Sequence, residues 1–249
     1  MYPPRRYSRV LSTILALSFS ALIFASPLLP RHEVEDVLHP SITRLARRQN
    51  PTVVVKGMEF GTQPRLEIRQ LQQNADQWNI FLLGMARFQQ TDQSNMTSYY
   101  QIAGIHGRPY IPWDDVPAAD GFDSPGYCMH VLNLFLAWHR PYLALFERTL
   151  YQHIIDAVNS FPAGAQRQRY ARAAISWRFP YWDWAMTPPS GQGTFPASLQ
   201  SPTVNVVMPN GSSMIPNPLY SYRFHPVSVK DFYFDPVSRR QKSQRVLES

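Results

Sequence analysis

Residues 128–147 read CMHVLNLFLAWHRPYLALFE, and this stretch decides both the expected fold and the expected site. An apolar run separates His130 from His139, and Pro141 follows two residues later. A third histidine, His106, lies upstream in the sequence GIHG. A neutral imidazole offers one nitrogen lone pair to a metal such as copper or zinc. Three histidines in one neighbourhood therefore predict a metal site.

Pro141 indicates where a helix begins. At about 100° per residue, one unbroken helix would place His130 and His139 on opposite sides, so it could not direct both at one ion. Proline is tolerated in the first turn of a helix and not in its interior. We therefore expect a helix over about 139–158, with His130 on the irregular segment before it.

The rest of the chain predicts a mainly helical single domain without internal repeats. Asp76 is expected to cap a helix that runs through Phe88, and Ser98 begins a short helix that delivers His106. A further helix is expected over 164–176. The segment 51–66 is expected to be irregular or a short strand. The segments 107–127 and 192–218 are expected to be loops, and the second of them contains five prolines.

Cys128 is the only cysteine of the chain, so it cannot form an intramolecular disulfide. A buried thiol, a metal ligand and a rarer covalent partner are the open alternatives, and an inert buried thiol is favoured by the residues alone. A blue-copper site would need an axial ligand such as Met129, which is too close in sequence to ligate without strain. His153, about 21 Å beyond His139 along the helix, and His225 are interpreted as structural. The YWDW sequence at 181–184 is interpreted as packing and buried hydrogen bonds behind the metal-bearing helices.

The motifs GIHG, CMH and FLAWHRPYLALFE, followed by WRFPYWDWA at 177–185, resemble the first copper half-site of tyrosinases, and of the fungal branch in particular. The similarity extends from QWNIFLLGMARFQ at 77–89 to NPLYSYRFHP at 217–226. The resemblance implies a mainly α fold, a tyrosinase-like helical bundle around a copper centre, here incomplete and with long irregular loops.

The resemblance also implies a chemistry. In the family two copper ions, each held by three histidines, use dioxygen to hydroxylate monophenols at the ortho position and to oxidise o-diphenols to o-quinones, as in melanin biosynthesis. His106, His130 and His139 match the ligands of the first copper. Cys128 matches the cysteine that forms a thioether with the second of these histidines, here His130. The implied partners are a phenolic small molecule and dioxygen.

The second copper of the family needs a His-x-x-x-His pair and a further histidine, and only His153 and His225 follow His139 here. We therefore expect a partial copper-binding domain over 49–237, an off-pattern basic tail over 238–249 and a truncated gene product that is inactive alone. Two alternatives stay open. One is a non-catalytic copper-binding fragment or pseudoenzyme, and the other is a zinc hydrolase that uses the same three histidines. Against the hydrolase, no carboxylate lies near the histidines in sequence except Glu147, two helical turns beyond His139.

The formal net charge of +7 does not predict a nucleic-acid partner. Residues 1–48 carry seven basic and three acidic side chains and residues 238–249 carry four and one, which leaves thirteen of each sign over 49–237. Residues 1–25 read as a secretory signal, and residues 26–48 read as a propeptide that ends in two arginines. The apolar run is short for a membrane span, so no stable anchor is expected. A secreted, extracellular chain could carry N-glycans at the sequons of Asn95 and Asn210.

Overall fold

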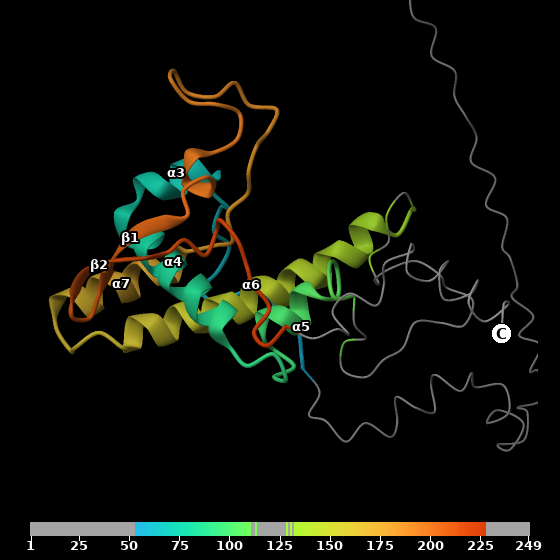
Figure 1. The fold of residues 1–249 in the computed structure, drawn as a ribbon, viewed down its shortest axis with the longest axis horizontal. Helices are drawn as coiled ribbons and strands as arrows, with labels where there is room; N and C mark the ends of the chain where they lie inside the picture. The colour runs from blue at the N-terminus through green and yellow to red at the C-terminus, as the bar shows by residue number, and fades with distance from the viewer. Residues whose placement is uncertain (1–52, 111–112, 114–127, 129, 131, 228–249) are drawn as a thin grey trace, which may run out of the picture. The chain divides into compact units, whose positions relative to one another are not determined.

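Two long helices, α4 (Ala75–Gln90) and α6 (Phe135–Asn159), form the centre of the computed structural model (Figure 1). The structure describes residues 53–110, 113, 128, 130 and 132–227. The helices cross closely at Gly84, where an added Cβ would lie 3.1 Å from the Cα and the N atoms of Ile154. A residue without a side chain therefore lets the two backbones approach, and the crossing fixes how α6 is held.

Helix α4 begins at Ala75, two residues before the start expected with Asp76 as the cap. Asn74 is the N-cap, and its side chain accepts a hydrogen bond from the Gln77 N–H over 3.2 Å. Asp76 lies in the first turn, where its charge favours the helix dipole. The expectation that Asp76 caps the helix was wrong, because the side-chain oxygen of Asn74 accepts the hydrogen bond from the first turn.

Helix α6 also begins earlier than expected, at Phe135 and not at His139. Pro141 therefore lies inside the helix, in its second turn. Proline lacks the N–H that would donate to the carbonyl of Ala137, so one backbone hydrogen bond is lost. The rings of Trp138 and Tyr142, on either side of Pro141, stack at 5.4 Å and stabilise this turn. His130 precedes the helix, as expected.

The shorter helices follow the expected order. Ser98 caps α5 (Tyr99–Ala103) by accepting from the Gln101 N–H. Helix α7 (Ala165–Ser176) packs against both α4 and α6. Helix α3 (Ile68–Gln73) was not predicted, although Glu67 and Gln70 form a reciprocal capping box at its start. The mainly helical, tyrosinase-like fold expected from the sequence is confirmed.

The segment 192–218, expected to be a long loop, contains a β-hairpin. Strands β1 (Thr203–Met208) and β2 (Gly211–Pro216) pair antiparallel, with Met208 opposite Gly211 across a two-residue turn. Asn79 of α4 pins the hairpin, because its side chain accepts from the Val207 N–H over 2.7 Å and donates to the Val207 carbonyl over 3.0 Å. The prolines at the edges of these strands and in the Pro209-Asn210 turn hid a pattern of β-branched residues.

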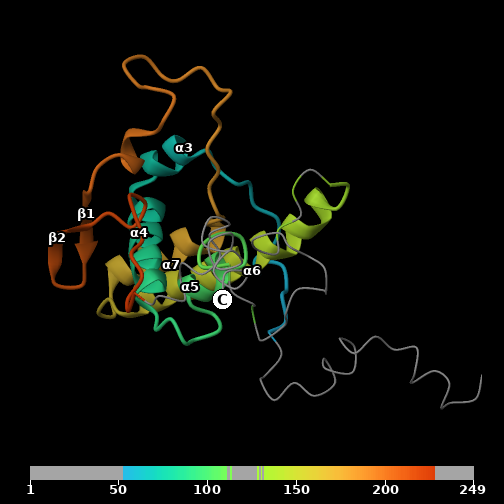
Figure 2. The same cartoon turned by 45° about the vertical axis from the view of Figure 1, so that its right-hand side comes forward.

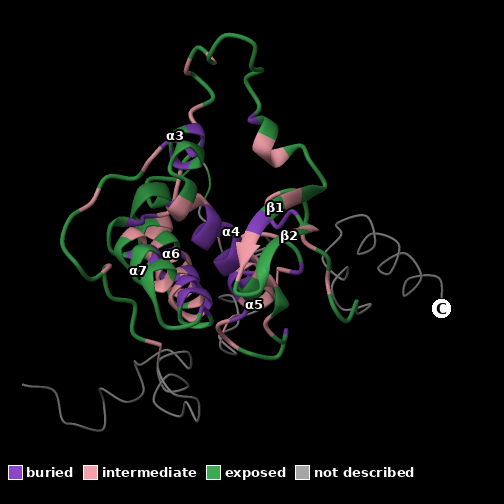
Figure 3. Ribbon diagram, turned by 90° about the vertical axis from the view of Figure 1, so that its left-hand side faces the viewer, coloured by how far each residue is buried: buried purple, intermediate pink, exposed green. Residues whose placement is uncertain are grey.

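Helix α4 is the most buried element of the structure's centre. Figures 2 and 3 show it between the hairpin on one side and α6 with α7 on the other. The largest buried side chains of α4 include Phe81 and Phe88. The ring of Phe81 stacks at 5.8 Å on that of Trp177, which is buried at the end of α7. The core therefore holds α6 at its C-terminal half and leaves its N-terminal end to carry the site.

The YWDW sequence departs from its interpretation as buried packing. Trp184 is 74% exposed and Trp182 is 37% exposed, and Asp183 caps a local turn by accepting from the N–H groups of Ala185 and Met186. Trp182 contacts Phe195 edge to face at 5.3 Å, within the same loop region. These side chains form a surface cluster and no buried network behind α6.

Several expectations lie outside the described residues: the signal 1–25, the propeptide 26–48, the tail 238–249 and nearly all of the segment 111–127. In the part of the chain that is described, no helix is long and apolar enough to cross a membrane.

Candidate metal centre

Three separate segments bring the three predicted histidines together. His106 follows α5 in a turn, where its N–H donates to the Ala103 carbonyl over 3.1 Å. His130 lies on the segment before α6, and His139 is in the second turn of α6. One ring nitrogen from each histidine lies within 4.8 Å of the other two. We call these residues the histidine triad.

The geometry of the triad fits a single ion. The Nε2 atoms of His106 and His139 are 3.1 Å apart, and the ring centroids of the three pairs are separated by 5.1, 5.2 and 5.4 Å. Two imidazole nitrogens that each bind an ion at about 2.0–2.1 Å lie roughly 3–3.5 Å from each other. The donors are all imidazoles, which suit copper and zinc.

A backbone contact sets the tautomer of His139. Its Nδ1 lies 2.7 Å from the Phe135 carbonyl oxygen, which can only accept a hydrogen bond. The proton therefore resides on Nδ1, and Nε2 keeps its lone pair toward His106. Metal-binding histidines are commonly oriented in this way by an acceptor behind the ring. Sequence reasoning missed this partner because it began the helix four residues too late.

Aromatic side chains hold the ring of His106. Tyr142 stacks on it at 5.5 Å with an interplanar angle of 16°, and Trp138 lies behind at 6.2 Å. Burial lowers the pKa of His106 below its ordinary value, and the neighbouring His139 and His130 lower it further. Both causes favour the neutral imidazole, which is the form that binds metal. The spacing of Trp138 and Tyr142, one helical turn apart, was the available signal for this support.

Cys128 lies beside the triad without belonging to it. Its Sγ is 3.5 Å from Nδ1 of His130 and 3.9 Å from the His106 carbonyl oxygen. His130 is the exposed member of the triad and is carried by no helix. The thiol is therefore next to the histidine whose orientation the backbone restrains least.

The triad contains no carboxylate. Glu147 is buried and engaged, because it pairs with Arg65 over 2.6 Å and accepts from the Phe179 N–H over 2.8 Å. It therefore ties 178–179 to α6 and is not placed to act as a base, which disfavours the zinc hydrolase. His153 stacks on Phe88 at 5.1 Å, and His225 hydrogen-bonds Gln89 and Gln93. Neither of these histidines belongs to the triad.

The fold and the site together define a helical metal-binding protein, because three imidazole nitrogens lie close enough to hold one metal ion. The model for the common central domain of tyrosinase matches residues 96–248, and the chain belongs to the tyrosinase family. It is 47% identical over 170 residues to a tyrosinase of Podospora anserina and 46% identical over 188 residues to one of Neurospora crassa. These alignments cover 66% and 72% of this chain but only 30% and 27% of the two relatives.

Solved structures show the same relationship. The structure of latent and active mushroom tyrosinase superimposes with a TM-score of 0.61 at 28% identity, over 75% of this chain and 48% of that one. The holo-protyrosinase of Aspergillus oryzae gives a TM-score of 0.61 at 29% identity, over 70% of this chain and 33% of that one. The resemblance seen in the sequence motifs is thus confirmed at the level of family and fold.

Proposed function

We propose that this chain binds one copper ion through His106, His130 and His139 and that it forms the first half of a copper-dependent phenol-oxidising centre. The observation that carries the proposal is the convergence of three imidazole nitrogens within 4.8 Å in a member of the tyrosinase family. Copper, when bound, supplies one-electron redox chemistry and reactivity toward dioxygen. The proposed reactions are ortho-hydroxylation of monophenols and oxidation of o-diphenols to o-quinones.

The protein's own part is to hold the imidazoles neutral and aimed at one point. The Phe135 carbonyl fixes the proton on Nδ1 of His139, and the Tyr142 ring restrains His106 by stacking. Because these supports come from α6, whose other end is packed against α4, the core determines the geometry of the site. Such preorganisation keeps ligands in position before the ion arrives.

Cys128 has a proposed role that depends on its nearness to His130. We expect a thioether between Sγ and a carbon of the His130 ring, supported by the 3.5 Å separation of Sγ and Nδ1. Forming this bond removes one hydrogen from the thiol and one from the ring, and dioxygen accepts the two electrons and two protons. The bond would fix the exposed histidine of the triad where no helix does so.

The described residues contain one histidine triad, and this favours a second candidate, a copper-binding chain without oxidase activity. Metal analysis and a catechol oxidation assay on the purified 249-residue chain test copper binding and oxidase activity separately. We expect about one copper per chain and no quinone formation from this chain by itself. Robust turnover would contradict the view that half a centre is inactive, and absence of bound copper would contradict the proposal as a whole.

A further inference from the structure

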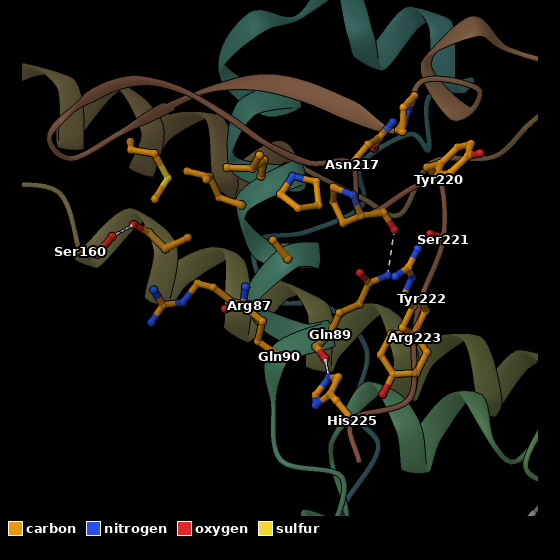
Figure 4. A pocket seen from close by; sticks show the side chains of 18 of the residues that line it. Arg87, Gln89, Gln90, Ser160, Asn217, Tyr220, Ser221, Tyr222, Arg223 and His225 are labelled. Atoms are coloured by element: carbon orange, nitrogen blue, oxygen red, sulfur yellow. Dashed lines mark hydrogen bonds between the residues drawn. The ribbon is translucent and has the colours of Figure 1, made fainter. Parts of the chain in front are cut away.

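A cavity separate from the triad lies along α4 and against the C-terminal end of α6. It has a volume of about 650 Å³ and is enclosed by α4, the end of α6, the hairpin and the return segment 217–225 (Figure 4). Ala157 in its lining is 18 residues beyond His139, which corresponds to about 27 Å along α6. We call this cavity the hairpin pocket, and none of the three histidines of the triad lines it.

Hydrogen bonds hold the walls of the hairpin pocket in fixed positions. Gln89 donates to the Pro218 carbonyl over 2.8 Å, and the His225 ring nitrogen Nε2 lies 2.6 Å from the Gln89 carbonyl (Figure 4). Asn217 donates to the carbonyls of Ser198 and Ser201, each over 2.8 Å. The return segment and the hairpin are thus both anchored to fixed points, so the cavity is formed before any ligand binds. Ligand pockets of roughly 300–1,000 Å³ are usually formed in advance in this way.

The lining combines an apolar floor with cationic side chains. Leu83, Met208 and Ile215 contribute aliphatic surface, and Tyr220 and Tyr222 contribute rings. Arg87 enters from α4 and Arg223 from the return segment, and both are exposed. No aspartate or glutamate is among the residues that line the cavity. Within the described ranges no ion pair to Arg87 or Arg223 is formed, so both guanidinium groups are available to an anion.

We propose that the hairpin pocket binds a small aromatic anion, a carboxylate or sulfonate attached to an apolar ring system. The ring would lie on the aliphatic and tyrosine surface, and the acidic group would lie beside a guanidinium at the mouth. Guanidinium groups bind carboxylates, and also tetrahedral oxyanions such as phosphate, with two parallel hydrogen bonds, which favours an acidic ligand over a neutral one. The proposal does not depend on copper or on the proposed function.

Two dyes that differ in charge test this site. The probes are 8-anilinonaphthalene-1-sulfonate and the uncharged N-phenyl-1-naphthylamine, titrated by fluorescence against the full chain. We expect Arg87→Gln/Arg223→Gln to weaken binding of the sulfonate about tenfold and to leave the neutral dye unchanged, since each tenfold step corresponds to about 1.4 kcal/mol. The single variants then show which arginine holds the charge. Arg172→Gln, on the exposed surface of α7, is the matched control and is expected to change neither dye.

A steric variant tests the location. Ala86→Phe fills the cavity from α4 and is expected to weaken both dyes, with circular dichroism used to check the fold. Ile215→Asp, on the hairpin, replaces aliphatic surface of the pocket with a carboxylate. If Ala86→Phe does not fold, this variant is expected to weaken both dyes, the sulfonate more than the neutral dye. Sulfonate binding that is equal in the wild type and the double arginine variant would overturn the anion site. Binding of both dyes unaffected by Ala86→Phe or Ile215→Asp would place the dyes elsewhere, such as on the exposed Leu132 and Leu136 near the triad, and would also overturn it.

Discussion

The Nδ1 atom of His139 lies 2.7 Å from the carbonyl oxygen of Phe135, one turn earlier in the same helix. The contact exists only because α6 begins before His139, so that the carbonyl of Phe135 in the first turn can accept a hydrogen bond from His139 in the second. The helix thereby supplies both the ligand and the acceptor that fixes its tautomer. A ligand held by its own backbone needs no partner from elsewhere in the chain.

Tyr142 is expected to support copper binding through its ring and not through its hydroxyl. The ring stacks on His106 at 5.5 Å, so Tyr142→Phe should leave copper affinity unchanged, whereas Tyr142→Ala should lower it at least about tenfold, as for other supports of metal ligands. Copper titration with a competing chelator measures both variants. Equal affinity in the alanine variant would show that the stacking contributes nothing.

Gly84 is expected to be essential for the packing of α4 on α6. A Cβ there would lie 3.1 Å from the backbone of Ile154, so Gly84→Ala should lower the free energy of unfolding by about 1–3 kcal/mol, although alanine favours helices by about 1 kcal/mol. Gly57→Ala is the matched control, because no heavy atom lies within 4 Å of its added Cβ. Urea denaturation compares the two. A Gly84→Ala chain as stable as the control would contradict the close crossing.

His153 is expected to make stability depend on pH. Burial lowers its pKa below the ordinary value of 6.5, Asp156 partly opposes this and Arg87 adds to it. Because the folded pKa lies below the unfolded one, protonation favours the unfolded chain. The contribution is fully present above about pH 6.5 and is lost as the pH falls through the folded pKa.

His153→Phe tests this, since a phenyl ring can keep the stacking on Phe88. Between about pH 7.5 and pH 5 the wild type should lose more stability than the variant, measured as the free energy of unfolding in urea. The same loss in both proteins would exclude His153 as the cause.

Asn95 and Asn210 are expected to be accessible to glycosylation if the chain is secreted. Both are exposed, and Asn210 lies in the two-residue turn of the hairpin. The Asn95 side chain accepts from the N–H and the hydroxyl of Thr97 within its own sequon. Expression in a secreting eukaryotic host, followed by enzymatic deglycosylation and mass analysis, should show a shift that Asn210→Gln reduces. An unchanged mass after deglycosylation would contradict the expectation at both sites.

Sequence patterns predicted α5 well, because Ser98 caps it, and they also predicted α7, which has no side-chain cap. They failed where one rule was given too much weight. Pro141 predicts a start of α6 at about His139, whereas the helix begins at Phe135. A proline in the second turn removes a single backbone donor, and Trp138 stacks on Tyr142 across it. Prolines at 202, 209 and 216 likewise concealed a hairpin, although the β-branched residues at 203, 204, 206 and 207 were a usable strand signal.

The triad could be named from the sequence, but its convergence could not be derived from spacing. His106 follows α5 in a turn and His139 lies in α6, and only the packing of α5 and α6 on α4 brings their Nε2 atoms to 3.1 Å. The exposed position of Trp184 was also beyond sequence reasoning, because an aromatic motif does not indicate which side of a loop faces solvent.

Copper titration of the triad variants tests the central claim most directly. His106→Ala, His130→Ala and His139→Ala are compared with His153→Gln and His225→Gln, which alter histidines outside the triad. The account predicts about one tightly bound copper per wild-type chain, a loss of affinity of at least about 100-fold in each triad variant, and little change in the two controls. Copper that binds the triad variants as tightly as the wild type would contradict a site in which three imidazoles share one ion.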